Sequence, residues 1–537
     1  MICNYRKDML MNYNDLANYK VVCEADASAY LLGAAKWLSD KLSCDMDADK
    51  LITVTVNKCV VGWCVNISDC CISICGESEP MTVCAIYEFC STLQPSQNDG
   101  SAYRQKGWSI AAPAYDGGSL CEVVYNDGSG ISSDDDNVNS NQCYMQAVCE
   151  TSADQFRAYL EKLENCGYQR VFYNTMKSKE EQDNLFAQYQ KGKASVYTYY
   201  IPAFRTVRIV EDRASVAIDK FEYKCDHDEH SETDIILYGI KLHPRGICCG
   251  EKNSDPTFLN CGALLMMKLA DNSLFVIDGG HDLQATPAAQ AELWRYMHEI
   301  TGTPEGEVVR ISCWFITHSD SDHFVMIMKL LQDFTSEIKI ERMLLNYQKT
   351  CRGFDNRARI AVEKLSPDTK VLKCRAGMSF MMASVKVDVM TAHEDTFDAT
   401  NGQRTWYRNN NDNSNILRIT TPDGRRYMIL GDYTTLRMPN LLATYADEEF
   451  KCDIVQIAHH SWNDLGDLYM AIGAEYALWP QYPYTNFYNP IQFRNATRCA
   501  KHLEAAGAKY HYYSGINTAN LVCKDGKIDV ILTETVY

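Results

Sequence analysis

Four side chains that can bind a metal ion lie within six residues of one another: His318, Asp320, Asp322 and His323. They follow a β-branched and aromatic run that starts at Val308 and predicts a buried strand, and an apolar stretch that can form a helix comes after them. Imidazole and carboxylate groups this close would repel one another or lack partners in a dry pocket. At the end of a strand they converge on a cation, so the sequence predicts a metal site here.

The alternative is an ordinary polar loop at the start of a helix. Ser319, Asp320 and Ser321 are all good N-cap residues. Capping explains neither histidine, so we favour the metal site.

Three further groups of polar residues also follow apolar runs that predict strands. Asp278 ends the second strand of an expected hairpin and is followed by two glycines. Asp432 follows Gly431 at the end of another buried strand, where a carboxylate is costly unless it is paired. His459 and His460 follow a third, and two adjacent histidines at a strand end favour a functional role.

In this order, the four groups resemble the motifs of the metallo-β-lactamase fold. The run from His318 to His323 is similar to the His-x-His-x-Asp-His motif, with Asp320 in place of the middle histidine. That His-x-Asp-x-Asp-His version resembles the branch of competence-type DNA-uptake proteins and some phosphodiesterases. The His-His-Gly-Ser motif of that branch is similar to His459-His460, with Ser461 in place of glycine.

The resemblance implies a role for each candidate residue. Asp278 would support the metal loop without binding metal, as carboxylates behind imidazole ligands do. Asp322 and His460 would be catalytic, His460 by holding the substrate oxyanion or protonating the leaving group. The implied metal ligands are His318, Asp320, Asp322, His323, His393, Asp432 and His459, with Asp432 bridging two ions.

The roles of two positions, one of them in this ligand set, are left open. His393 lies where the family's third histidine ligand would fall, and it could equally be a surface histidine. Where the branch often carries a histidine before a proline, this chain has Asn489 before Pro490. We interpret Asn489 as a helix N-cap with proline at the first helical position.

Composition predicts the setting of this site. With 46% hydrophobic and 11% aromatic residues, the chain fits a soluble globular protein. A net charge of −18 disfavours nonspecific binding to nucleic acid or to anionic membranes. We find no apolar leader and no run long enough for a transmembrane helix. The 24 cysteines form no paired Cys-x-x-Cys knuckles, so we expect free thiols in a reducing cytoplasm.

At 537 residues the chain should hold several domains, and we predict three. Residues 1–110 alternate strands and helices as a small α/β accessory domain, and residues 111–222 form an α+β accessory domain. Polar residues 94–107 read as a linker and 126–137 as a solvated loop. Tyr197, Tyr199 and Tyr200 could line a binding surface in the second domain, but strand propensity explains them more simply. Residues 233–537 would be the catalytic domain, for which the resemblance implies a four-layer αβ/βα sandwich.

The function implied by the resemblance is a metal-dependent hydrolase that uses a hydroxide bound by two metal ions, on a small-molecule or phosphodiester substrate. Zinc is the expected ion, and the extra carboxylate at Asp320 leaves manganese or iron open. The alternatives are a nuclease acting on DNA or RNA, and a noncatalytic binding protein that retains the fold. No oligomeric state follows from the sequence.

Overall fold

The protein is described from a computed structural model, in which the chain forms two compact units. The first comprises residues 1–173, 182–215 and 399–402, and the second comprises 174–181, 216–398 and 403–537. The described residues are 16, 18–42, 44, 47–58, 63–68, 71–76, 79, 82–83, 85–86, 89, 112–126, 143–214, 217–218, 235–241, 262–282, 285–346, 357–392, 410–481, 490–524 and 527–533. His393, Asn489, residues 94–107 and most of 126–137 therefore lie outside the described residues.

The first sheet of unit 1 has the strand order β1-β2-β4-β3, with β3 antiparallel to its neighbour and the others parallel. Its strands are β1 (Tyr19–Cys23), β2 (Lys50–Val56), β3 (Trp63–Ile67) and β4 (Cys71–Gly76). Helix α2 (Ala29–Leu42) packs its apolar stripe on this sheet, and Leu31, Ala34 and Leu38 join Ile52 and Ile72 in one core.

The second sheet of unit 1 is antiparallel over its described pairs and has the order β5-β6-β10-β9-β8-β7. Its strands are β5 (Ser119–Asn126), β6 (Cys143–Cys149), β7 (Gln169–Met176), β8 (Asn184–Lys191), β9 (Ala194–Ile201) and β10 (Thr206–Arg213). Helix α4 (Ala153–Asn165) packs on it, and the expected Ser152 cap accepts a hydrogen bond from the Gln155 amide.

Two features of this sheet bear on the sequence predictions. Tyr197, Tyr199 and Tyr200 are buried, so the described chain offers no exposed tyrosine surface there. Cys149 is disulfide-bonded, so the expectation of free thiols is wrong at this position. Cys313, Cys374, Cys452 and Cys499 carry free, buried thiols.

The larger sheet of unit 2 has the order β17-β16-β14-β13-β12-β11-β25-β26, with β15 paired to β14. Strands β13, β14, β16 and β17 run parallel, and the expected hairpin joins β12 to β13. The strands are β11 (Ile236–Gly239), β12 (Leu264–Lys268), β13 (Leu274–Asp278), β14 (Val309–Phe315), β15 (Ile338–Ile340), β16 (Arg342–Leu345), β17 (Lys370–Lys373), β25 (Thr518–Lys524) and β26 (Lys527–Thr533).

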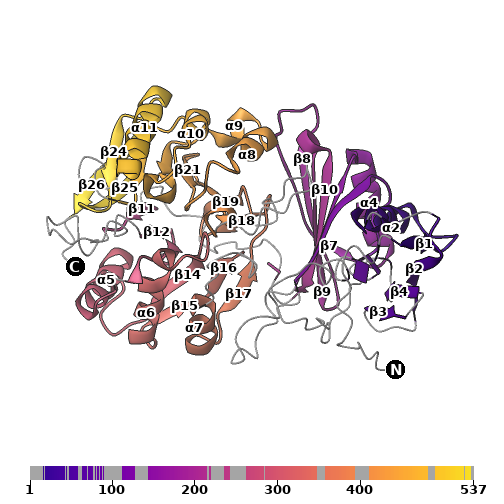
Figure 1. Cartoon of the computed structure of the whole chain (residues 1–537). Coiled ribbons are helices and arrows are strands. Elements are labelled where there is room, and N and C mark those ends of the chain that lie inside the picture. The colour runs from indigo at the N-terminus through magenta and orange to yellow at the C-terminus, as the bar shows by residue number, and fades with distance from the viewer. Residues whose placement is uncertain are drawn as a thin grey trace. The chain divides into compact units, whose positions relative to one another are not determined.

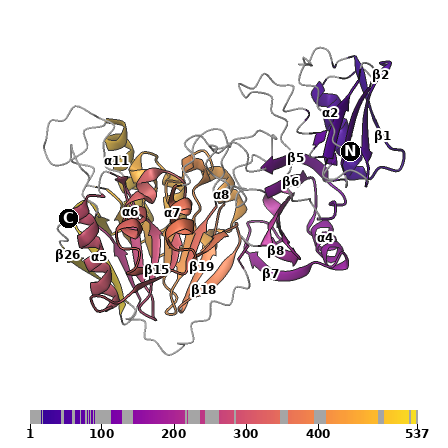
Figure 2. The same ribbon diagram turned by 90° about the horizontal axis from the view of Figure 1, so that it is seen from below.

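Helices α5 (Pro287–Thr301), α6 (Val325–Asp333) and α7 (Arg357–Leu365) bury their apolar faces on this sheet. Leu293 and Met297 of α5 share one core with Leu330 of α6, Val362 of α7 and Trp314 of β14. Figures 1 and 2 show these three helices on one side of the sheet.

The smaller sheet of unit 2 has the order β18-β19-β20-β21-β22-β23-β24, antiparallel up to β21 and parallel from there. Its strands are β18 (Ser379–Met382), β19 (Val385–Val389), β20 (Leu417–Thr420), β21 (Arg426–Ile429), β22 (Ile454–Gln456), β23 (Tyr476–Trp479) and β24 (Tyr510–Tyr513). Helices α8 (Met438–Thr444), α9 (Asp447–Phe450), α10 (Gly466–Ile472) and α11 (Pro490–Ala506) lie on its outer side in Figure 1.

Strand direction gathers the predicted site residues. Strands β13 and β14 are parallel and are followed by Asp278 and His318, and the parallel strands β21 and β22 are followed by Asp432 and His459. The carboxyl ends of parallel strands meet at one edge of a sheet, so each sheet of unit 2 delivers its polar loops to one edge.

Among the described residues, no helix is both long and apolar enough to span a membrane.

A buried ion pair holds the smaller sheet together away from this edge. Arg418 of β20 donates from Nη2 to Asp388 Oδ2 of β19 at 2.8 Å, and its Nη1 contacts Glu449. Burial raises the pKa of Asp388, but Arg418 and Lys386 outweigh it and hold this pKa below its ordinary value. Ionised Asp388 therefore contributes stability above the pKa of an unfolded aspartate, and the contribution is lost as the pH falls through the folded pKa.

We expect Asp388→Asn to destabilise unit 2 by about 3 kcal/mol at pH 7, because it leaves Arg418 buried with one carboxylate fewer. Urea unfolding at pH 7 and at pH 3 measures this loss, which should shrink at the lower pH. An equal loss at both pH values would contradict an ionic origin.

Candidate metal centre

Asp278 forms the hydrogen bonds that hold the loop of candidate ligands after β14. It is 2% exposed and has φ 60°, in the left-handed region. Its Oδ1 accepts the Thr317 amide at 2.8 Å, and the Thr317 hydroxyl donates to the same carboxylate at 2.9 Å. Its Oδ2 accepts Nδ1–H of His323 at 2.7 Å. Asp278 thus fixes both ends of the loop after β14, as expected of a carboxylate that supports metal ligands.

The loop between Asp278 and α6 is closed by backbone contacts that need glycine. The carbonyls of Gly279 and Gly280 accept the amides of Ile327 and Met326, which satisfies two free N–H groups at the start of α6. A Cβ on Gly279 would lie 3.0 Å from the Phe324 Cα. The capping alternative finds no support, since Asp320 makes no side-chain cap on the 3₁₀ turn η7 (Ser321–His323).

Three imidazoles turn their Nε2 atoms towards Asp432. His318 Nδ1 donates to Thr317 Oγ1 at 3.0 Å, His323 Nδ1 to Asp278 at 2.7 Å and His460 Nδ1 to the Pro480 carbonyl at 2.9 Å. Each Nε2 is buried and has no hydrogen-bond partner among the described residues. A buried nitrogen left without a partner is costly unless it binds something, and each of the three can bind a metal ion through Nε2.

Asp432 lies between these nitrogens with one oxygen on each side. Its Oδ1 is 3.1 Å from His323 Nε2 and 3.6 Å from His460 Nε2. Its Oδ2 is 3.8 Å from His318 Nε2 and 3.9 Å from His459 Nε2. A carboxylate with two oxygens can bridge two cations, and this placement offers one oxygen to each.

The other two aspartates complete the two sides. Asp322 Oδ2 lies 3.2 Å from His460 Nε2, and Asp320 Oδ2 lies 3.6 Å from His318 Nε2. One atom each from Asp322, His323, Asp432 and His460 lies within 4.8 Å of the others, a spacing that suits one metal ion. Donors of this kind fit a divalent ion of the zinc, manganese or iron class.

In the absence of a metal ion, the charged side chains of the site stabilise one another. Burial lowers the pKa of His323, but Asp432, Asp278 and Asp322 outweigh it and hold this pKa well above its ordinary value. Burial raises the pKa of Asp432, but the imidazoles of His323, His460 and His459 hold it well below its ordinary value. Carboxylates ionised this firmly are suited to a cation.

The turn that carries His459 and His460 has an unusual backbone. His459, His460 and Ser461 have φ of 49°, 44° and 58°, and each such residue costs on the order of 1 kcal/mol or more. Ser461, which stands where the resembled motif has glycine, takes the left-handed conformation itself. Gln492 of α11 donates to the His460 carbonyl at 2.8 Å and helps to hold the turn.

Sequence reasoning missed several residues of the site. Asn410 and Asn411 contact Asp320 and His459, in a run of asparagines that the sequence does show. Gln456 holds the Gly431 loop by accepting the amides of Leu430 and Gly431 at 2.8 Å. His281, just after the two glycines, has its pKa lowered by burial and interacts electrostatically with Asp322.

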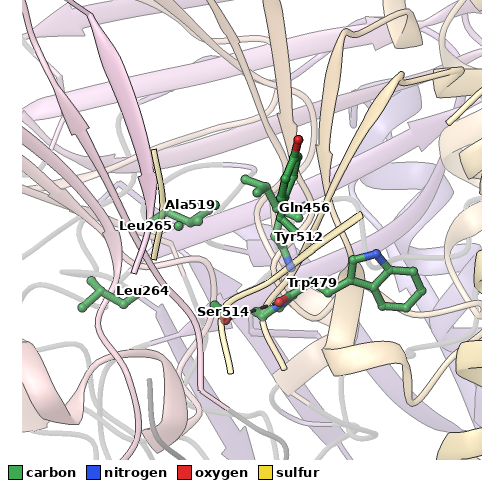
Figure 3. A pocket seen from close by; sticks show the side chains of 10 residues that line it. Leu264, Leu265, Gln456, Trp479, Tyr512, Ser514 and Ala519 are labelled. Carbon is green, nitrogen blue, oxygen red and sulfur yellow. Dashed lines mark hydrogen bonds between the residues drawn. The ribbon is translucent and has the colours of Figure 1, made fainter. Parts of the chain in front are cut away.

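A small apolar hollow lies between the two sheets of unit 2. Figure 3 shows Leu264 and Leu265 on one side and Trp479 and Tyr512 on the other. Pro480 in its wall is the residue whose carbonyl holds His460. The hollow contains none of the candidate ligands, so it backs the site and does not form it.

No family model matches the chain, and no curated protein does. The similar solved structures include the diiron β-hydroxylase CmlA from Streptomyces venezuelae (12% identity, TM-score 0.33, 54% of either chain covered). They also include the metallo-β-lactamase fold protein YhfI from Bacillus subtilis (12%, 0.31, 52% of this chain and 96% of that one) and a diphosphatase of the PhnP family (11%, 0.27, 47% and 89%). The chain thus spans about half the length of CmlA.

Gly431 tests how tightly the two halves of the site are packed. It has φ 56°, and a Cβ there would lie 2.7 Å from Thr317 Cβ. Gly302 has a similar φ of 68°, with nothing within 4 Å of a Cβ. We expect Gly302→Ala to cost about 1 kcal/mol for the backbone alone. Gly431→Ala should cost about 1–3 kcal/mol more, because Thr317 must move.

Urea unfolding of both variants measures the difference. Gly431→Ala should also lose metal, since Thr317 orients His318, while Gly302→Ala should keep it. Equal stability of the two variants would contradict the close contact between Gly431 and Thr317.

Proposed function

We propose that this protein is a metal-dependent hydrolase of the metallo-β-lactamase type with two divalent ions, acting on a small phosphodiester-class substrate. The observation that carries the proposal is the set of three buried Nε2 atoms without partners, turned to the two oxygens of Asp432. The two sheets of unit 2, with α5–α7 on one and α8–α11 on the other, support a four-layer αβ/βα sandwich.

The ligands divide into two sets around Asp432. Asp322, His323, His460 and Oδ1 of Asp432 would hold one ion. His318, Asp320 and Oδ2 of Asp432 would hold the other, with His459 beside it and His393 as the predicted further ligand. Divalent ions held there would lower the pKa of a water and polarise the bond to be cleaved.

His460 and Asp322 are the two residues that the sequence analysis made catalytic. The buried Nε2 of His460 lies within the four-residue group, which supports a ligand role in place of direct contact with substrate. The side chain of Asp322 is 16% exposed, and those of Asp320 and His459 are 33% and 21% exposed. Substrate would therefore approach from the side of these three residues, where the Asp322 oxygen that does not bind the ion can orient a water or accept its proton.

The chemistry of the substrate follows from the charge of the site. Ions that neutralise three aspartates leave a cationic centre, which suits a phosphodiester anion. The net charge of −18 disfavours long nucleic acids, whose binding rests on many basic contacts. A small phosphodiester remains the simplest substrate class.

Elemental analysis of the purified protein should find about two divalent ions per chain, and the protein should cleave a chromogenic phosphodiester such as bis(p-nitrophenyl) phosphate. Asp432→Ala should lose at least one ion and nearly all turnover, since it removes the oxygen from both ligand sets. His460→Ala should lose the ion of the Asp322 set. Asp388→Asn serves as a control that destabilises the same unit without touching a ligand.

The outcomes separate the alternatives. A metal content near zero that added zinc or manganese does not restore would reject the hydrolase. Two ions without turnover on phosphodiesters, β-lactams or thioesters would favour a binding protein. Preference for DNA or RNA with a steep salt dependence would favour a nuclease. If His460→Ala retains both ions, His460 acts on the substrate and is not a metal ligand.

A further inference from the structure

A short turn beside the site carries two buried asparagines onto two candidate ligands. The 3₁₀ turn η9 (Asn410–Asn413) places Asn410 Nδ2 2.7 Å from Asp320 Oδ1 and Asn411 Nδ2 2.9 Å from His459 Nε2. Asn410 is 2% exposed and Asn411 5% exposed. Both contacted residues belong to the same side of Asp432, the side of Oδ2.

This turn is fixed to both ligand strands. The amide of Asn415 and its Nδ2 both donate to the Thr317 carbonyl, at 2.9 and 2.8 Å. The Ser414 hydroxyl accepts the Asp432 amide at 3.1 Å, and the Thr434 hydroxyl donates to Asp412. The residues before His318 and after Asp432 therefore hold the turn in place, and its side chains cannot move freely away from the site.

Asn410 is not arranged for stability alone. Its amide nitrogen is used, but its Oδ1 is buried without a hydrogen-bond partner among the described residues. An acceptor left in this way lowers the stability of the fold. Such a cost is expected where a side chain serves a bound group, here by occupying Asp320 Oδ1 and leaving Oδ2 turned towards His318 Nε2 at 3.6 Å.

Asn411 blocks a nitrogen of His459, whereas Asn410 supports Asp320 as a ligand. Its carboxamide occupies His459 Nε2, the nitrogen nearest to Asp432, whichever way the amide is turned. The other ring nitrogen, Nδ1, is occupied by Asn463. An ion could bind His459 only by displacing the carboxamide of Asn411.

We propose that Asn410 and Asn411 are positioning residues that set the affinity of the ion held by His318, Asp320 and Asp432. Asn410 supports this ion through Asp320, and Asn411 keeps His459 from binding it. This inference rests on the proposed function, since it concerns one of the two ions of that site. Among the described residues, it makes the ligand set on this side one imidazole and two carboxylates, a harder set than that of the Asp322 side, and His393 is the predicted further ligand.

The test uses the full-length protein stripped of metal and titrated with Mn²⁺, with free Mn²⁺ followed by electron paramagnetic resonance. A parallel titration uses Zn²⁺ in competition with a chromophoric chelator. The wild type should bind two ions. Asn410→Ala should bind one of them roughly 10–100-fold more weakly, as loss of a ligand's support does, and leave the other unchanged. Asn411→Ala should bind both at least as tightly as the wild type.

Two further variants separate this effect from general loosening. Asn410→Leu keeps the volume of the side chain and removes both its donor and its orphaned acceptor, so it should fold and show the same loss of one ion. Asn346→Ala is the matched control, a 1% exposed asparagine that donates to the Cys374 carbonyl, and it should lose stability while keeping both ions.

Several results would overturn the inference while leaving the hydrolase intact. They are unchanged affinity for both ions in Asn410→Ala and Asn410→Leu, the same loss of one ion in Asn346→Ala, and weaker binding in Asn411→Ala. Loss of the ion in His393→Ala but not in Asn410→Ala would show that His393 completes this side. A wild type that binds no ion would reject the proposed function, and the inference with it.

Discussion

The carboxylate of Asp278 is the interaction on which the rest of the site depends. It is buried, and it spends its hydrogen-bonding capacity on the Thr317 amide, the Thr317 hydroxyl and the His323 ring. Because the Thr317 hydroxyl donates to Asp278, it accepts from His318, so one carboxylate sets the tautomer of both histidines. Both rings then turn Nε2 inward. The His-x-Asp-x-Asp-His sequence would present no defined set of donors without this contact from a neighbouring strand.

The backbone around the site shows what this arrangement costs. Asp278, His459, His460 and Ser461 all have positive φ, a conformation that residues other than glycine seldom adopt. Gly431 lies so close to Thr317 that no side chain fits between them. Asn272, Ala383 and Ser384 of the same unit also have positive φ, in the turns between β12 and β13 and between β18 and β19. Strain at the site itself is expected where geometry serves a ligand. Elsewhere the same unit is held by ordinary means, such as the aliphatic core under α5 and α6 and the Arg418–Asp388 ion pair.

The sequence predicted much of unit 2 because its signals are local. Apolar runs ending in Asp278, His318, Asp432 and His459 read as strands with polar ends, and parallel pairing brings these ends together within each sheet. The hairpin before Asp278 and the helix that starts at Pro490 were also visible as local patterns. What could not be predicted depends on pairs far apart in sequence. Asn410 meets Asp320 across 90 residues, and nothing in either segment names the other.

The burial of Tyr197, Tyr199 and Tyr200 could not be read from the sequence for the same reason, since alternation in a strand does not say whether its second face is covered. Likewise, the disulfide at Cys149 could not be inferred from cysteine spacing, because pairing depends on the distance and direction of two Cα–Cβ bonds in the fold and not on separation in sequence. The sequence could not show whether His459 or His460 has the better-placed nitrogen for a metal ion. His459 and His460 are adjacent and chemically identical, and only the fold shows that one Nε2 is buried and the other contacts Asn411.

The position of Asp432 explains why the two sides of the site need not be alike. Its Oδ1 faces the buried nitrogens of His323 and His460, and its Oδ2 faces His318 and the more exposed His459. An ion on the first side would meet two imidazoles already oriented by hydrogen bonds at Nδ1. An ion on the second side would meet one such imidazole and Asp320, a residue held from outside by an asparagine. An imidazole oriented in this way binds an ion more tightly, and the first side offers two of them against one on the second side. The first side should therefore fill first, and the second side should govern how the protein responds to the choice of metal.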